Sequence, residues 1–196
     1  MTLFHALGPF AAQGGVVAAP GMVLVSPTSI TYSGTSATLG ANGQVTFTAV
    51  TSLSLNGCFT ADFDNYVIFV NDINSTGTQP RLIRLRDSGT DELGNYFTQQ
   101  FLRASSTSVT AGRSTGLNFL GMGETSLVAA GVHVAVYGPN LSQPTAFRSV
   151  DVHGESNARI TDYAGTHSLS TAYDGFTILP LANTITGKVA VYGIRS

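Results

Sequence analysis

The chain has 196 residues, the size of a single domain with or without an attached arm. Charged residues make up 10% of the sequence and the formal net charge is −2, whereas an ordinary soluble domain has about 25% charged residues. This composition argues against a protein that binds nucleic acid by neutralising phosphates, and against a polybasic membrane anchor. The hydrophobic fraction of 43% argues against intrinsic disorder.

Residues 1–26 are largely apolar, and no lysine or arginine occurs before Arg81. A secretory signal needs a positive region and an unbroken apolar stretch, but Gly8-Pro9 and Gly14-Gly15 interrupt this one. An interfacial membrane helix would need basic residues on its polar face. We therefore expect an extended N-terminal arm that docks in a groove on another subunit, with a disordered tail as the alternative. The residues expected to make the contact are Leu3, Phe4, Leu7, Phe10, Val16 and Val17.

After residue 26, apolar residues recur with period two and no 3.6-residue period stands out. Val45, Phe47 and Ala49 are expected to share one face of a strand. Residues 66–70 are apolar at every position, and so on both faces, as expected for a central strand of a sandwich. The clearest strands are expected at 44–50, 66–70, 81–86, 96–102, 132–137 and 188–194.

Turn signals separate these strands, and Asn42-Gly43 is the strongest because both residues tolerate the positive φ of a type I′ hairpin. About ten short strands at this spacing are typical of a sandwich. We predict an all-β fold: an antiparallel β-sandwich, jelly-roll-like, that forms one domain over residues 27–196 and follows the arm of residues 1–26.

One pattern occurs twice: an aromatic residue, an aspartate, a turn residue and a second aromatic residue precede a strand at 63–66 and again at 173–176. An aspartate in such a turn can accept hydrogen bonds from backbone N–H groups. We predict two equivalent strand entries rather than a catalytic repeat. The residues expected to stabilise the turns are Asp64, Asn65, Asp174 and Gly175.

Known catalytic signatures are missing from the sequence, including a nucleophile elbow, a zinc-protease helix, a P-loop and a dinucleotide fingerprint. Asp151 and His153 should share a strand face and, with Asp162 and His167, could hold a metal, although a hydrogen-bonded polar face is the favoured interpretation. Cys58 is the only cysteine and is expected to be a small buried residue. We predict no catalytic residue, no metal and no cofactor.

Two further polar groups have structural interpretations. Asp62 and Asp64 could bind calcium with Asn65, but a calcium site needs six or more oxygens, so a turn is favoured. Three arginines within residues 81–86 are expected to form a solvated strand face, or ion pairs with Asp87 or Asp91.

Several turns and strand entries, taken together, resemble small virion proteins of tailed bacteriophages, of the kinds called tail-fibre, minor tail and head-decoration proteins. The resemblance covers residues 27–196 and does not include the arm. The segments that carry it are Pro27–Thr31, Gly43–Thr48, Ser52–Phe59, Phe63–Tyr66, Leu85–Asp91, Ser108–Arg113, Gln143–Thr145, Ala172–Thr177 and Gly187–Gly193.

The resemblance implies a non-enzymatic β-sandwich component of a virion, commonly a homotrimer, assembled in the host cytoplasm. The first hypothesis is a tail fibre, tip or knob that contacts a host-surface glycan or protein. The alternatives are a capsid decoration or head-fibre protein that its arm attaches to other virion proteins and, as a remote third, a polysaccharide depolymerase. No nucleic-acid partner and no membrane insertion are expected.

Overall fold

The computed structural model describes residues 21–103, 108–154 and 159–195. In these ranges the chain forms strands and connecting turns, and no helix there is long and apolar enough to span a membrane. The strands are β1 (Gly21–Val25), β2 (Ser29–Leu39), β3 (Val45–Asn56), β4 (Asn65–Asn74), β5 (Gln79–Asp87), β6 (Thr90–Asp91), β7 (Tyr96–Arg103), β8 (Val109–Leu117), β9 (Leu120–Thr125), β10 (Ala130–Tyr137), β11 (Thr145–His153), β12 (Arg159–His167), β13 (Gly175–Pro180) and β14 (Ile185–Arg195).

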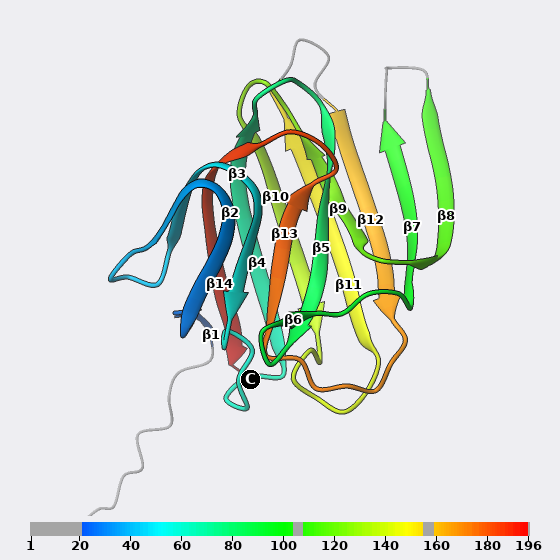
Figure 1. Cartoon of the computed structure of the whole chain (residues 1–196). Helices are drawn as coiled ribbons and strands as arrows, with labels where there is room; N and C mark the ends of the chain where they lie inside the picture. Colours follow the sequence, from blue (N-terminus) through cyan, green and yellow to red (C-terminus); the bar gives the residue numbers. More distant parts are fainter. Residues whose placement is uncertain (1–20, 104–107, 155–158, 196) are drawn as a thin grey trace, which may run out of the picture.

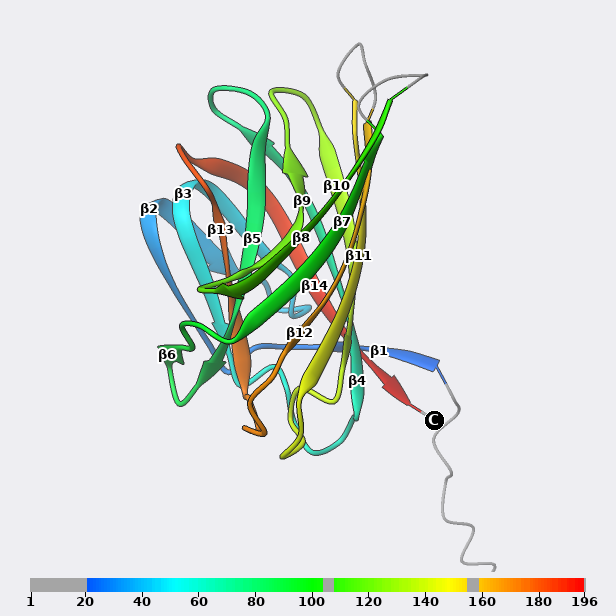
Figure 2. The same cartoon turned by 90° about the vertical axis from the view of Figure 1, so that its right-hand side faces the viewer.

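All the strands belong to one antiparallel sheet, in the order β6-β5-β13-β3-β14-β4-β10-β11-β12-β7-β8, with β1 beside β14, β2 beside β3 and β9 beside β5. The sheet curls on itself into two layers (Figures 1 and 2). The front layer holds β2, β3, β13, β5 and β9, and the back layer runs from β14 to β8. The predicted all-β, antiparallel sandwich fold is confirmed.

The core lies between the layers, where alternate residues of facing strands meet. Leu53 on β3, Ile83 on β5 and Ile178 on β13 point inward from the front layer and are fully buried. Ile68 on β4 and Val134 on β10 meet them from the back layer and are equally buried. The expected alternation is confirmed for β10, where Val132, Val134 and Val136 are buried and His133 and Tyr137 are exposed.

Strand β9 closes the sandwich, because it pairs with β5 and also packs against β11 and β12 of the back layer. This approach needs glycine: a Cβ on Gly121 would lie 2.6 Å from the Tyr163 ring, and a Cβ on Gly123 would lie 2.7 Å from the Asp151 side chain. The glycine content hid this strand from the period-two search, although every residue of it except Glu124 is buried.

The turns differ from the prediction in one respect. Both central residues of the Ser88-Gly89 turn have positive φ, at 50° and 81°, and they join β5 to β6 across the Asp87–Thr90 pair. This is the type I′ arrangement that was expected at Asn42-Gly43. There only Gly43 has positive φ, and Gly40 N–H donates to the Gln44 carbonyl across a longer loop.

The expected single face of Val45, Phe47 and Ala49 is interrupted by a bulge. The register between β2 and β3 shifts at Gly34, Ala49 has a φ of 47°, and Val50 takes the buried position instead. A bulge inserts one residue and so reverses the faces beyond it. A strict period-two pattern has no means of showing this extra residue.

The N-terminal arm is described only from Gly21. Residues Gly21–Val25 form β1, which pairs with Val191–Arg195 of β14 and so belongs to the sheet. The contact residues named for the arm (Leu3, Phe4, Leu7, Phe10, Val16 and Val17) lie outside the described residues, so their docking stays a prediction.

An ion pair between Arg81 and Asp72 is fully buried between the layers. Arg81 Nε donates to Asp72 Oδ2 at 2.9 Å, and Nη2 donates to the other carboxylate oxygen. The expectation of a solvated arginine face is therefore wrong for Arg81, whose neighbour Leu82 is buried as well. Position 81 lies next to the β5–β9 bulge, which turns its side chain inward.

Breaking this pair should destabilise the fold strongly. We expect Asp72→Ala to lower the free energy of unfolding by about 3–5 kcal/mol, because it leaves the Arg81 charge buried and unpaired. The double variant Asp72→Leu with Arg81→Met should recover most of the loss. Urea unfolding monitored by circular dichroism measures both. An Asp72→Ala protein as stable as the wild type would contradict the pairing.

Candidate functional site

The outer face of the back layer exposes apolar side chains where a soluble sheet would normally carry polar ones. Phe69 is 43% exposed and Val152 is 54% exposed. The strand register aligns Ala190, Phe69, His133 and Val150 in one row across β14, β4, β10 and β11. We call the following residues the outer patch: Phe69, Ile73, His133, Val150, Val152 and Tyr192.

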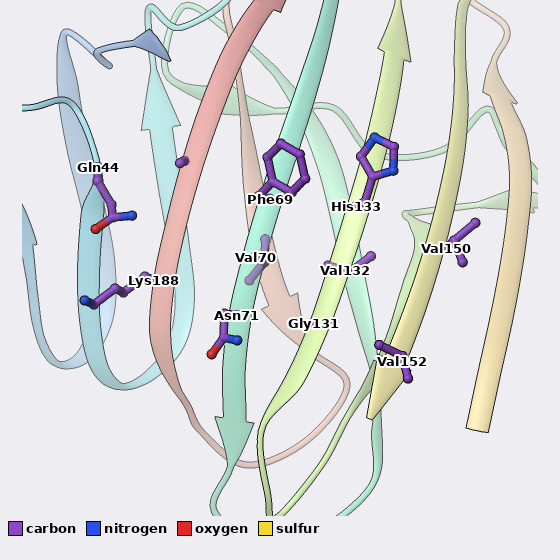
Figure 3. Close-up of a pocket in the computed structure, with 11 residues that line it drawn as sticks. Gln44, Phe69, Val70, Asn71, Gly131, Val132, His133, Val150, Val152 and Lys188 are labelled. Carbon is purple, nitrogen blue, oxygen red and sulfur yellow. The ribbon is translucent and has the colours of Figure 1, made fainter. Parts of the chain in front are cut away.

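A shallow hollow of about 450 Å³ lies in the outer patch, with Gln44 and Lys188 at its polar rim. Figure 3 shows Phe69 and His133 side by side on neighbouring strands. Their rings stack, with centroids 5.3 Å apart and planes at 17°, and Tyr192 meets Phe69 edge-on at 5.7 Å. The stacked rings form a rigid apolar wall on an otherwise flat face.

The outer patch includes the outer face of residues 66–70, which form part of a central strand of the back layer, as expected. Tyr66, Ile68 and Val70 point into the core and are buried, whereas Phe69 on the outer face is 43% exposed. A strand that is apolar on both faces is expected to bury both of them. The sequence does not show whether the second face is buried by the same chain or by another molecule.

The face that carries the outer patch is broad. Four strands at about 4.8 Å spacing, each with about 27 Å of length, give it a footprint on the order of 500 Å², which the outer patch shares with Asn71, Arg148 and Lys188. Exposed apolar patches of several hundred Å² commonly mark interaction sites. The outer patch is therefore the strongest candidate functional surface in the described residues.

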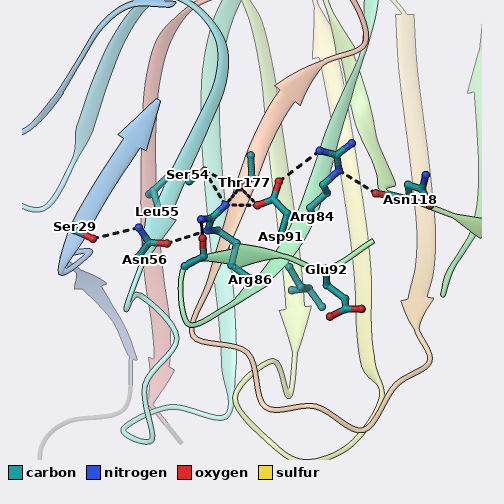
Figure 4. A network of polar contacts seen from close by, with 12 residues as sticks. Ser29, Ser54, Leu55, Asn56, Arg84, Arg86, Asp91, Glu92, Asn118 and Thr177 are labelled. Carbon is teal, nitrogen blue, oxygen red and sulfur yellow. Dashed lines mark hydrogen bonds and ion pairs between the residues drawn. The ribbon is translucent and has the colours of Figure 1, made fainter. Parts of the chain in front are cut away.

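A polar cluster lies on the outer side of the front layer, where β6 pairs with β5 (Figure 4). Arg86 bonds Asp91, Ser54 Oγ at 3.0 Å and Asn56 Oδ1 at 2.9 Å, while Arg84 lies 3.5 Å from Asp91. The ion pairs expected for Arg84 and Arg86 are confirmed. Since its donors meet protein acceptors, this network fastens the β5–β6 hairpin to β3 and β13.

The metal-site hypothesis is not supported by the geometry. Asp151 points into the core, but Asp162 points to the opposite, outer face. His167 pairs with Thr145, six residues along β11 from Asp151, which corresponds to about 20 Å. The side chain of His153 lies outside the described atoms, and the described residues hold no group of three metal-ligating side chains.

Asp151 and His167 are instead buried polar groups of the core. Asp151 Oδ2 accepts the Glu124 N–H at 2.9 Å, and burial raises the pKa of this carboxyl despite that bond and the nearby Arg81. His167 Nδ1 bonds the Tyr173 hydroxyl at 2.9 Å, and its ring meets Tyr96 at 4.5 Å. Burial lowers the pKa of His167 below its ordinary value of 6.5.

The two strand entries are held mainly by backbone groups. Asp64 contributes its carbonyl to Gly138 N–H at 2.9 Å, directly before Asn65 begins β4. Asp174 donates its N–H to Arg86 and accepts from Phe59, while its buried Oδ1 has no hydrogen-bond partner. At Gly175 a Cβ would collide with the Leu55 carbonyl, so glycine is required there.

Comparisons with known proteins add little beyond the fold. No protein-family model matches the chain, and no curated protein matches it. Among solved structures, the chain is similar to domain 4 of AbnA, an extracellular arabinanase of family GH43 from Geobacillus stearothermophilus, solved with arabinotriose. The similarity covers 85% of this chain and 82% of that one, at 14% identity and a TM-score of 0.32.

The buried histidine should make stability fall in mild acid. Because burial lowers the pKa of His167 in the folded protein, the unfolded chain binds more protons at this residue as the pH falls through 6.5. Wild-type protein should lose up to about 1.4 kcal/mol for each pH unit in this window, relative to a His167→Asn variant that does not titrate. Urea unfolding from pH 8 to pH 5 tests this, and parallel pH profiles would refute it.

Proposed function

We propose that this protein is a non-enzymatic structural component of a bacteriophage particle. In this proposal, residues 1–20 of one copy cover the outer patch of a neighbouring copy. The exposed outer patch is the observation that carries the proposal, because such a surface is favourable only when another chain removes it from water.

The arm suits the outer patch in chemistry. Residues 1–20 contain no lysine, arginine, aspartate or glutamate, and they are rich in leucine, phenylalanine, valine and alanine. The outer patch holds no carboxylate or guanidinium, and Lys188 lies only at its rim. An uncharged arm therefore covers an uncharged surface without the desolvation of buried charges.

The arm also suits the outer patch in length. The first described residue, Gly21, pairs with Arg195 of β14. Phe69 pairs with Ala190, which lies five residues before Arg195 in the same strand. This separation is about 17 Å. Twenty extended residues reach about 70 Å, which is enough to span from one copy to the next.

Exchange of arms around a closed ring gives the homotrimer that the bacteriophage resemblance implies, and it buries every outer patch equally. The proposed place on the particle is a tail fibre, tip or knob. A low charge density favours such assembly, because packed surfaces then bury few ionic groups.

Binding of the arm can be measured directly. A protein that lacks residues 1–20 should stay folded and monomeric, and it should bind a fluorescent peptide of residues 1–20 in an anisotropy titration. Phe69→Asp should weaken that binding about tenfold or more, because the site loses an aromatic contact and gains a charge.

Tyr32→Asp is the matched control, since Tyr32 is an equally exposed aromatic residue that lies on front-layer strand β2. This variant should bind the peptide as the wild type does. Light scattering of the full chain should give a trimer, and Phe69→Asp should give a monomer. A full chain that is monomeric at high concentration, or a peptide that ignores Phe69→Asp, would overturn the proposal.

A further inference from the structure

Two further hollows lie beside the outer patch, where the outer face continues over β12, β7 and β8. One hollow has a volume of about 210 Å³ and the other about 420 Å³, and they share Gln99 and Ala164. Because they share these residues, they form one continuous depression. We call it the polar groove, defined by Gln99, Phe101, Arg113, Arg148, Asp162 and Ala164.

The strand register sets the shape of the polar groove. Arg148, Ala164, Gln99 and Arg113 form one row across β11, β12, β7 and β8. This row spans three strand spacings, or about 14 Å. The small side chain of Ala164 lies between longer ones, so the floor of the groove is low at its centre.

The next row places an aromatic ring beside a carboxylate. Phe101 pairs with Asp162 and is 60% exposed, compared with 47% for Tyr137 and 46% for Tyr32. Asp162 also accepts a hydrogen bond from Arg148 at 2.8 Å. A bare ring and an oriented ion pair therefore border the same depression.

Arg81, Arg84, Arg86 and Arg148 form ion pairs, and Arg195 lies over the Phe63 ring, whereas Arg113 has neither kind of partner among the side chains that the structure describes. It is exposed on edge strand β8, and no ion pair joins it to another described residue. Its guanidinium is thus available to hold a planar anion with two parallel hydrogen bonds.

We propose that the polar groove binds an acidic saccharide, a sugar chain with carboxylate groups. The apolar C–H face of a sugar ring packs on Phe101, as apolar ligand surfaces do in binding sites. Gln99 and Asp162 offer the amide and carboxylate groups that hydroxyls require, and Arg113 binds the sugar carboxylate.

This combination favours a sugar over other ligands. An apolar ligand would leave Gln99 and Arg113 without partners, and a simple anion would make no use of Phe101. Two arginines against one aspartate give the groove a local charge of +1, opposite to the formal charge of −2 of the whole chain. The inference does not require the proposed virion role, since the groove is formed within one copy.

Calorimetric titration of the purified full chain with oligogalacturonate tests this inference. The matched ligand is the same oligomer with its carboxyls methyl-esterified, which removes the charge but keeps the sugar. The free acid should bind and the ester should bind about tenfold more weakly or not at all. Arg113→Gln should weaken binding of the acid about tenfold while leaving binding of the ester unchanged.

Phe101→Ala should weaken binding of both ligands, and Tyr32→Ala, on front-layer strand β2, should leave both unchanged. Light scattering on Arg113→Gln and Phe101→Ala should give the oligomeric state of the wild type, which separates this test from that of the arm. The inference is overturned if oligogalacturonate does not bind, if acid and ester bind equally, or if an oligoglutamate peptide binds as tightly as the sugar.

Discussion

The close approach of β9 to the back layer determines which face of that layer is exposed to other molecules. A strand that pairs with β5 and also lies against β11 and β12 closes the curled sheet along one side. Gly121 and Gly123 allow this contact, because any larger side chain would meet Tyr163 or Asp151. With the sheet closed on this side, one face of the back layer is buried against the core and the other is exposed to solvent.

That outer face is divided along its width. Over β14, β4, β10 and β11 it is apolar and held rigid by the stack of Phe69 and His133. Over β12, β7 and β8 it is polar and hollowed, with an exposed aromatic ring. The two halves differ in chemistry, so the arm and the saccharide that we propose as their ligands would occupy separate parts of the same face.

Much of the fold could be predicted from alternation in the sequence. The pattern over β10 gave the inner face because core residues repeat every second position, and the patterns over β3, β4, β5, β7 and β14 located those strands. The clearest expected strands did not include β8 and β9, since their glycines and small polar residues fit loops equally well, nor β2, β11, β12 and β13. The bulge at Gly34 and the buried Arg81 depend on register and neighbours, which a single strand pattern does not contain.

The candidate sites were harder to predict than the fold. Asp151 and Asp162 differ by an odd number of positions along different strands, and only the pairing of β11 with β12 shows that they face opposite sides. The exposure of one face of β4 could not be predicted for a related reason. An apolar residue gives the same sequence pattern whether its own chain or another molecule buries it. Residues far apart in the chain, such as Phe101 and Arg148, become neighbours through register alone.

Strand β8 has a consequence for how the protein behaves in bulk. It is the last strand of the sheet order, eight of its nine residues are exposed and one is half-buried, and Arg113 is its single charged residue. Open sheet edges add further strands from other molecules, and charge is the usual deterrent. The Arg113 guanidinium is therefore the only charge on β8 that opposes edge-to-edge pairing with another molecule. Aggregation of the protein should then depend on whether a bound anion neutralises this group.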